Sequence, residues 1–364
     1  MVETSPNYEP DYAVPPGETL GETLEAIGMS QAELAQRMGR PKKTINGIIM
    51  GTTAITPETS IQLERVLGIP CGFWTNLERN YQDAIAKNNE RSALGKETGF
   101  LNDVPYRELA QRGWIADYRN PVEKLQEIMD FFGVASPKEC VEIWNRPEIA
   151  FRHSQAFKSD RWALAAWLRK GQLEAQTTNV PDFDGGSFKG VLREIRGLTK
   201  EKAWKFEPAL KEYCANNGVV LALVQELKNT RVHGATHWFA GKPVIQLTLR
   251  YKTDDQFWFS FFHEAGHILL HGRKEIFVEK NIGGSLEKEE KEANLFASNL
   301  LIPKAYYEPF KRKGLFTRKG IMEFSSGMGI APGIVVGRLQ HDGLIPYRSN
   351  LNYLKKTFEW ACNG

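Results

Sequence analysis

The chain has 364 residues, of which 41% are hydrophobic and 11% aromatic, which is enough for two or three domains with cores of their own. Its net charge is only +3, so nucleic-acid binding would need a local basic patch. The four cysteines are scattered without a Cys-x-x-Cys pair, which excludes a disulfide scaffold and predicts reduced thiols. The polar N-terminus and the short apolar runs argue against a signal peptide and a membrane span, so we expect a cytoplasmic protein with no membrane partner.

Residues 19–81 predict a group of short helices with clear start and stop signals. Ser30 and Glu33 have the spacing of a capping box, in which Ser30 accepts backbone N–H groups and Glu33 reaches back. Pro41 is expected in the first turn of a helix over residues 42–49. Two short helices joined by a tight glycine turn form a helix-turn-helix, and the exposed tip of the second helix enters the major groove of DNA.

The helix over residues 42–49 has an apolar and a polar side. Its isoleucines are expected to face inward, which leaves Lys42, Lys43, Thr44 and Asn46 facing outward. The two lysines would mainly contact phosphate, whereas Thr44 and Asn46 are placed to read base edges. The alternative is a small helical domain that makes only protein contacts.

This stretch resembles the HigA-like branch of the XRE helix-turn-helix family. The resemblance lies in Ser30-Gln-Ala-Glu-Leu-Ala, Thr44-Ile-Asn-Gly-Ile-Ile, Ala54-Ile-Thr-Pro-Glu-Thr-Ser and the segment 67–81. It implies a dimeric repressor, often an antitoxin that binds its own promoter. We therefore expect a homodimer, formed through this domain, on double-stranded operator DNA.

Residues 83–205 are expected to be a mostly helical middle region. Residues 83–91 are predicted to be either a charged helix or a linker. The segment 83–101 has few large apolar residues, so it is the candidate for a linker that a protease could reach. Amphipathic helices are predicted over residues 121–132 and 159–170, the second of them ending at Gly171.

A small sheet is predicted next. Residues 219–224 form an apolar strand, and the segments 235–239 and 244–249 form a hairpin across residues 240–243. The helical middle and this sheet together give an α+β fold.

The motif His263-Glu264-Ala265-Gly266-His267 follows an apolar segment of helical composition. In a helix, positions i and i+4 lie on one face, about 6 Å apart along the axis. Two neutral imidazoles at this spacing can hold one zinc ion, with Glu264 beside them to take a proton from water at the metal. The alternative is a helix whose histidines merely pack or face solvent.

A zinc peptidase needs a third protein ligand. His271 would lie about 12 Å from His263 along a straight helix, too far to share one ion. A carboxylate from the predicted helix over residues 286–302 is the other common solution. The apolar stripe of that helix passes through Leu295, Phe296, Asn299 and Leu300. Glu292 stands at the start of the stripe and is the predicted ligand; Glu289 is the second choice, and Glu287 and Glu290 fall off the stripe.

These residues resemble the ImmA/IrrE metallopeptidases. The resemblance is strongest at residues 263–267 and 292–303, extends to residues 234–247 and 329–339, and covers roughly residues 150–345. It implies a thermolysin-like zincin core with two histidines and a glutamate on zinc. It also implies a peptidase that cuts a helix-turn-helix repressor and so releases genes for stress response, prophage excision or defence.

The segment 234–237 would then be the edge strand that pairs with an extended substrate peptide. His233 and His237 border it, and either could stabilise the oxyanion; a surface or structural role is the alternative for each.

The sequence thus predicts four parts. They are a helix-turn-helix domain over residues 1–82, a helical middle over 83–205, a zincin core over 206–345 and a tail over 346–364. We expect a DNA-binding regulator with a zinc endopeptidase domain that cleaves a repressor or antitoxin-like partner in trans rather than its own linker. The competing hypothesis is a non-proteolytic HigA-like repressor whose peptidase-like domain serves as a sensor or partner dock. The intact motif favours the enzyme, because a dock has no need of Glu264.

Overall fold

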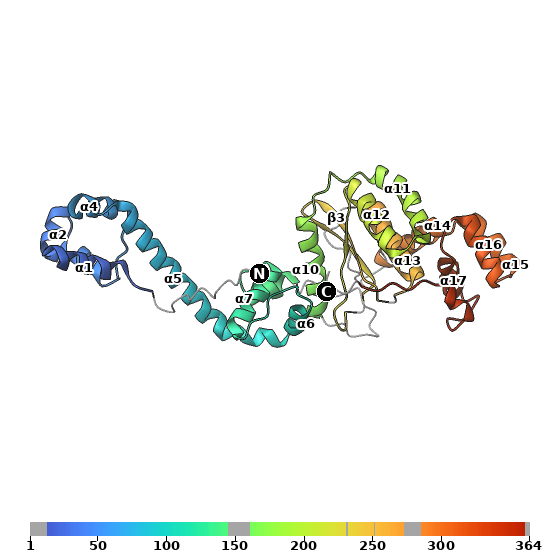
Figure 1. The fold of residues 1–364 in the computed structure, drawn as a ribbon, viewed down its shortest axis with the longest axis horizontal. Helices are drawn as coiled ribbons and strands as arrows, with labels where there is room; N and C mark the ends of the chain where they lie inside the picture. Colours follow the sequence, from blue (N-terminus) through green and yellow to red (C-terminus); the bar gives the residue numbers. More distant parts are fainter. Residues whose placement is uncertain (1–12, 145–160, 231, 251, 273–284, 361–364) are drawn as a thin grey trace. The chain divides into compact units, whose positions relative to one another are not determined.

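The computed structural model describes residues 13–144, 161–230, 232–250, 252–272 and 285–360. These residues are mostly helical with a small three-stranded sheet, and they form two compact units that divide between Gly99 and Phe100 (Figure 1). The predicted boundary after residue 205 therefore falls inside the second unit.

The first unit is a bundle of short helices and one long one. They are α1 (Pro16–Ile27), α2 (Gln31–Met38), α3 (Lys42–Ile49), α4 (Pro57–Leu67) and α5 (Cys71–Glu97). Their shared core contains the fully buried side chains of Leu20, Leu34, Ile45, Leu63 and Trp74. The spacing of these apolar residues matches one face of each helix, which confirms the predicted helix-turn-helix arrangement.

The helix boundaries follow from local capping. Ser30 accepts a hydrogen bond from the backbone N–H of Glu33 at 3.1 Å, and α2 ends at Gly39 in the left-handed conformation, φ 64°. The second contact of the predicted capping box, in which the Glu33 side chain reaches back to the start of the helix, is wrong. The Glu33 carboxylate instead accepts a hydrogen bond from Arg37 at 2.7 Å. Pro41 is the residue before α3 rather than part of its first turn.

The helix α5 runs unbroken for 27 residues. It passes through the predicted domain boundary after residue 82 and through most of the segment 83–101, the candidate linker. That segment is rich in Ala, Lys, Glu and Arg, which favour helix even where few apolar side chains anchor it. Of the two alternatives for residues 83–91, the helix is therefore confirmed and the linker is wrong.

The second unit begins with a series of helices that precede the sheet in the chain. They are η1 (Thr98–Asn102), α6 (Tyr106–Gln111), α7 (Pro121–Phe132), α8 (Pro137–Trp144), α10 (Arg161–Thr177), α11 (Gly185–Gly197), η2 (Leu198–Lys200) and α12 (Ala203–Asn216). The helix predicted over residues 121–132 is confirmed.

Helix α10 continues six residues past the predicted stop at Gly171 and packs against the sheet. A Cβ at Gly171 would lie 2.0 Å from Oε1 of Gln246. This glycine therefore allows close approach of helix and strand rather than ending the helix.

The sheet has the strand order β1-β3-β2. Strand β1 (Val220–Leu223) is parallel to β3 (Lys242–Leu247), and β2 (Gly234–Phe239) is antiparallel to β3. Ala240 and Gly241 make the hairpin turn with φ of 49° and 80°, so the predicted hairpin is confirmed. Within the part of the chain that the structure describes, β2 forms one edge of the sheet.

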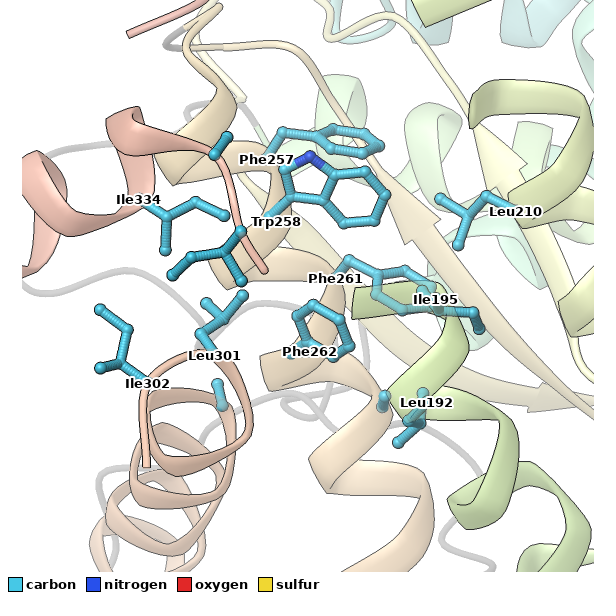
Figure 2. Close-up of a cluster of buried hydrophobic side chains, with 14 of the residues drawn as sticks. Leu192, Ile195, Leu210, Phe257, Trp258, Phe261, Phe262, Leu301, Ile302 and Ile334 are labelled. Carbon is cyan, nitrogen blue, oxygen red and sulfur yellow. The ribbon is translucent and has the colours of Figure 1, made fainter. Parts of the chain in front are cut away.

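Helix α13 (Asp254–His271) packs against the sheet and carries the aromatic core. Its side chains Phe257, Trp258, Phe261 and Phe262 are buried against residues of α11, α12 and the C-terminal helices, as Figure 2 shows. Four large rings in two turns fix the rotation and depth of this helix. This packing also sets the position of residues 263–267, which follow the rings in the same helix.

The chain continues through α14 (Ser285–Leu301), α15 (Lys304–Lys313), α16 (Arg318–Met328), α17 (Pro332–His341) and η3 (Asn350–Leu354). No single helix of the described residues is both long and apolar enough to cross a membrane; α16 and α17, bent by 112°, meet that test only as a pair. Helix α17 contributes Val335, Val336 and Leu339 to the core. Cys140 and Cys214 are buried and Cys71 is half-buried, all three with free thiols, while Cys362 lies outside the described residues.

Candidate metal centre

His263 and His267 lie one turn apart on α13, and their Nε2 atoms are 3.0 Å from each other. Glu290 of α14 places one carboxylate oxygen 3.2 Å from each of these nitrogens. All three ligand atoms lie within 4.8 Å of one another. Two imidazoles and a carboxylate that converge in this way are the donor set of a catalytic zinc site with room for a fourth ligand. The residues present therefore fit zinc.

The Glu290 side chain is mostly buried, and its charge is stabilised by the two histidines. Burial opposes ionisation, but hydrogen bonds with His263 and His267 outweigh it and hold the pKa of the Glu290 carboxyl below its usual value. Glu290 is therefore a carboxylate, the form that a metal ligand requires.

Glu292, the predicted third ligand, lies elsewhere. Its carboxylate is 3.2 Å from Nε2 of His271 and 3.7 Å from the Lys288 ammonium. Neither Glu292 nor the second choice, Glu289, belongs to the cluster of potential ligands. The structure thus corrects the predicted ligand from Glu292 to Glu290.

The reason lies in which face of α14 is buried. Its innermost residues are Ala293, Ala297 and Leu301, in line with Glu290, whereas Leu295 is 60% exposed. The buried face of α14 is therefore rotated relative to the stripe of large apolar residues in the sequence. The difference arises because alanines, and not large apolar side chains, form most of the buried face.

The small residues allow α13 and α14 to approach closely. A Cβ at Gly266 would lie 3.4 Å from Cα of Ala293 and 3.1 Å from the Phe296 ring. Gly266, inside the metal motif, therefore faces the other helix across this contact and helps to bring Glu290 to the two histidines.

Glu264, the candidate base, is buried against the edge strand. Thr236 of β2 shares its hydroxyl hydrogen between Oε2 of Glu264, at 2.7 Å, and the backbone carbonyl of Glu264, at 3.0 Å. A Cβ at Gly234 would come within 2.8 Å of Oε1 of Glu264, so the glycine leaves room for the carboxylate. Sequence reasoning missed Thr236; the only signal was its place in the predicted edge strand.

Each metal-facing histidine has a partner for its other ring nitrogen. Nδ1 of His263 lies 3.0 Å from Oδ1 of Asn294, and Nδ1 of His267 lies 3.1 Å from Nδ1 of His271. Such partners fix the ring orientation of metal-ligating histidines. The sequence did not predict Asn294 as a partner of His263.

The two histidines that border β2 are placed differently from each other. His237 follows Thr236 in the strand, so its side chain leaves the face opposite to Glu264, where it is 1% exposed. This placement contradicts a contact between His237 and the reacting carbonyl. His233 lines a small hollow with Gln256 and Ser260 of α13, and its role at the oxyanion stays a prediction.

An apolar pocket of about 140 Å³ lies between α13, α14 and α17. Phe259 lines the pocket and has its ring centroid 6.2 Å from that of His263, so one lining side chain also lies next to a metal-facing histidine. Its other lining side chains include Leu301, Ile302, Ile334, Arg338 and His341. Such a pocket suits an apolar side chain of moderate size.

In the first unit, the predicted DNA-facing residues lie on the solvent side of α3. Lys42, Lys43 and Asn46 are exposed and Thr44 is half-buried, while Ile45 and Ile48 on the other side are in the core. This arrangement is the one expected of a recognition helix.

Comparisons with known proteins match these two units separately. A family model described as the IrrE N-terminal-like domain of peptidases matches residues 218–318, and a helix-turn-helix model matches residues 20–74. The first match contains all residues of the candidate metal centre.

Curated and solved relatives match the first unit. An uncharacterized HTH-type transcriptional regulator, YddM of Escherichia coli (strain K12), is 32% identical over 72 residues, which are 20% of this chain and 77% of the relative. A HigA-family antidote protein from Coxiella burnetii is 30% identical over 23% of this chain and 94% of its own, with a TM-score of 0.22. The Pseudomonas aeruginosa antitoxin HigA, solved with the higBA promoter, is 31% identical over 24% and 90%, with a TM-score of 0.21. The chain therefore belongs to the helix-turn-helix transcriptional regulators through its N-terminal unit and carries an IrrE/ImmA-like peptidase domain in its C-terminal unit.

Proposed function

We propose that the C-terminal unit is a zinc-dependent endopeptidase with a zincin-type core. The observation that carries this proposal is the convergence of His263, His267 and Glu290 beside the buried carboxylate of Glu264. A bound zinc ion would lower the pKa of water and polarise the peptide carbonyl.

Glu264 acts as the general base and then as the acid. It takes a proton from the attacking water and passes it to the nitrogen of the leaving amine, so that water adds across the peptide bond. The hydrogen bond from Thr236 holds this carboxylate in place before substrate arrives.

The substrate peptide binds in extended form along β2. An extended peptide can add to a sheet as a further strand at its edge, and β2 is the edge strand that contacts Glu264. The pocket lined by Phe259 and Ile334 then receives an apolar side chain of the substrate. The substitution Ile334→Trp narrows this pocket. It should slow cleavage of peptides with Leu or Phe at the position that the pocket receives, and it should spare peptides with Ala there. A competition assay on a peptide library measures the difference. Equal slowing of all peptides would contradict this assignment.

We propose that the N-terminal unit binds operator DNA as a homodimer and that the peptidase cuts a helix-turn-helix repressor or antitoxin-like protein in trans in the cytoplasm. Cleavage in trans is supported by α5, because self-cleavage in the segment 83–97 would require an unbroken helix to unwind into a strand.

The test compares the wild-type chain with Glu264→Gln, Glu290→Ala and the surface control Glu207→Gln. Glu207 forms an exposed pair with Lys211 on α12. Wild type and the control should carry about one zinc per chain and cut the repressor partner. Glu264→Gln should keep the metal and lose cleavage, and Glu290→Ala should lose both. Cleavage that persists in Glu264→Gln would refute the proposal, and zinc binding without any cleavage would make the domain a metal-dependent sensor.

A further inference from the structure

Three side chains form a row that leads outward from the metal centre. Nδ1 of His267 lies 3.1 Å from Nδ1 of His271, and Nε2 of His271 lies 3.2 Å from the carboxylate of Glu292. We propose that His271 and Glu292 position His267 for metal binding through this chain of hydrogen bonds. The inference rests on the metal centre of the proposed function.

The hydrogen atoms of the chain can be assigned from the ring chemistry. When Nε2 of His267 binds a metal, the neutral ring carries its hydrogen on Nδ1, which must then donate. The atom that faces it, Nδ1 of His271, therefore accepts, which places the hydrogen of a neutral His271 on Nε2. That N–H donates to Glu292, so each of the two contacts in the row has one donor and one acceptor.

The surroundings of His271 suit this role. Its side chain is only 5% exposed, so water competes little for either nitrogen. The residue lies one turn after His267 on α13, which aligns the two rings, and Glu292 reaches it from α14. Glu290 and Glu292 of α14 thus have different contacts. Glu290 contacts the two metal-facing histidines, and Glu292 contacts His271.

The two metal-facing histidines are held unequally. His263 is held by a neutral amide, Asn294, whereas the chain behind His267 ends on a charged carboxylate. A carboxylate at the end of the chain strengthens each hydrogen bond in it and makes Nε2 of His267 a better donor to the metal. Loss of such a partner typically costs about 10 to 100-fold in metal affinity.

The experiment measures zinc affinity of the full chain by competition with a chromophoric chelator. His271→Phe and Glu292→Ala should each weaken zinc binding about 10 to 100-fold, and Glu292→Gln, which keeps an acceptor, should recover part of the loss. Glu323→Ala, which removes an exposed carboxylate of α16, should bind zinc like the wild type.

The double variant gives the decisive comparison. Because Glu292 acts only through His271, Glu292→Ala should cost nothing further in the His271→Phe background. If it costs as much there as in the wild type, Glu292 acts on the metal without His271 and the chain is refuted. His271→Gln, which can still donate and accept, replaces His271→Phe if melting of the metal-free chain shows that the Phe variant does not fold.

The outcomes also separate this inference from the proposed function. A wild-type chain without zinc affinity would refute the metal centre itself. A wild type that binds zinc, a Glu290→Ala variant that does not, and His271 and Glu292 variants that match the wild type would refute only the positioning chain.

Discussion

Replacing Asp254 by Asn should stabilise the protein, and the gain should grow as pH rises. Asp254 opens α13 with its side chain fully buried against α17, where a Cβ at Gly333 would lie 2.2 Å from Oδ1. Burial, and secondarily the neighbouring Asp255, raise the pKa of Asp254 from 3.8 to about 7. The folded chain therefore binds this proton more tightly than the unfolded chain does.

The sign and size of the Asp254 contribution to the free energy of unfolding follow from proton linkage. A group whose pKa is raised on folding contributes stability in full below its unfolded pKa, and that contribution is lost as pH rises through the folded value. For Asp254 the loss begins near pH 4 and is complete above about pH 7. At about 1.4 kcal/mol per pH unit, it amounts to about 4 kcal/mol in total, of which about 2 to 3 kcal/mol falls between pH 5 and pH 8.

Urea unfolding of the full chain, followed by tryptophan fluorescence from pH 5 to pH 8, measures this difference. The free energy of unfolding of Asp254→Asn relative to wild type should rise by about 2 to 3 kcal/mol across that range. The neighbouring substitution Asp255→Asn should instead destabilise the chain, because it removes the negative charge that balances the mostly buried Lys355 ammonium at 2.7 Å. A stability difference for Asp254→Asn that is constant with pH, or larger at pH 5, would refute the reasoning.

Two further predictions concern helix packing and DNA. Gly171→Ala should lower the free energy of unfolding by about 1 to 3 kcal/mol, because its Cβ meets Gln246. Gly190→Ala, where a Cβ meets nothing within 4 Å, should raise it by about 0.5 to 1 kcal/mol in the same urea titration; equal effects would show that Gly171 has no packing role. In gel-shift titrations with promoter DNA, Lys42→Ala should weaken binding to all sequences and reduce its salt dependence, whereas Asn46→Ala should mainly reduce discrimination between bases. No salt-sensitive binding by the wild-type chain would remove the operator role.

Local signals were sufficient for much of the fold. Ser30, Gly39 and the turn at Ala240 and Gly241 define element boundaries through capping and turn chemistry, which depend on a few adjacent residues. The pair His263 and His267 could be placed because both stand on one helix, whose geometry is fixed.

The features that were mispredicted depend on contacts between elements. Glu290 faces the histidines because Ala293 and Ala297 form the inner side of α14, and alanines give a weak signal in a sequence. In the sequence, Gly171 has the pattern of a helix end. Only its contact with the strand residue Gln246 shows that it allows close packing instead. Thr236 and Asn294 gain a role only from partners that are distant in the sequence.

The candidate metal centre takes two ligands from α13 and the third from α14, with Gly266 at the contact between the helices. A metal ion held there would be a cross-link between two helices, and its binding energy would add directly to the stability of the C-terminal unit. Removal of the ion by a chelator would then loosen the attachment of α14 as well as stop any chemistry.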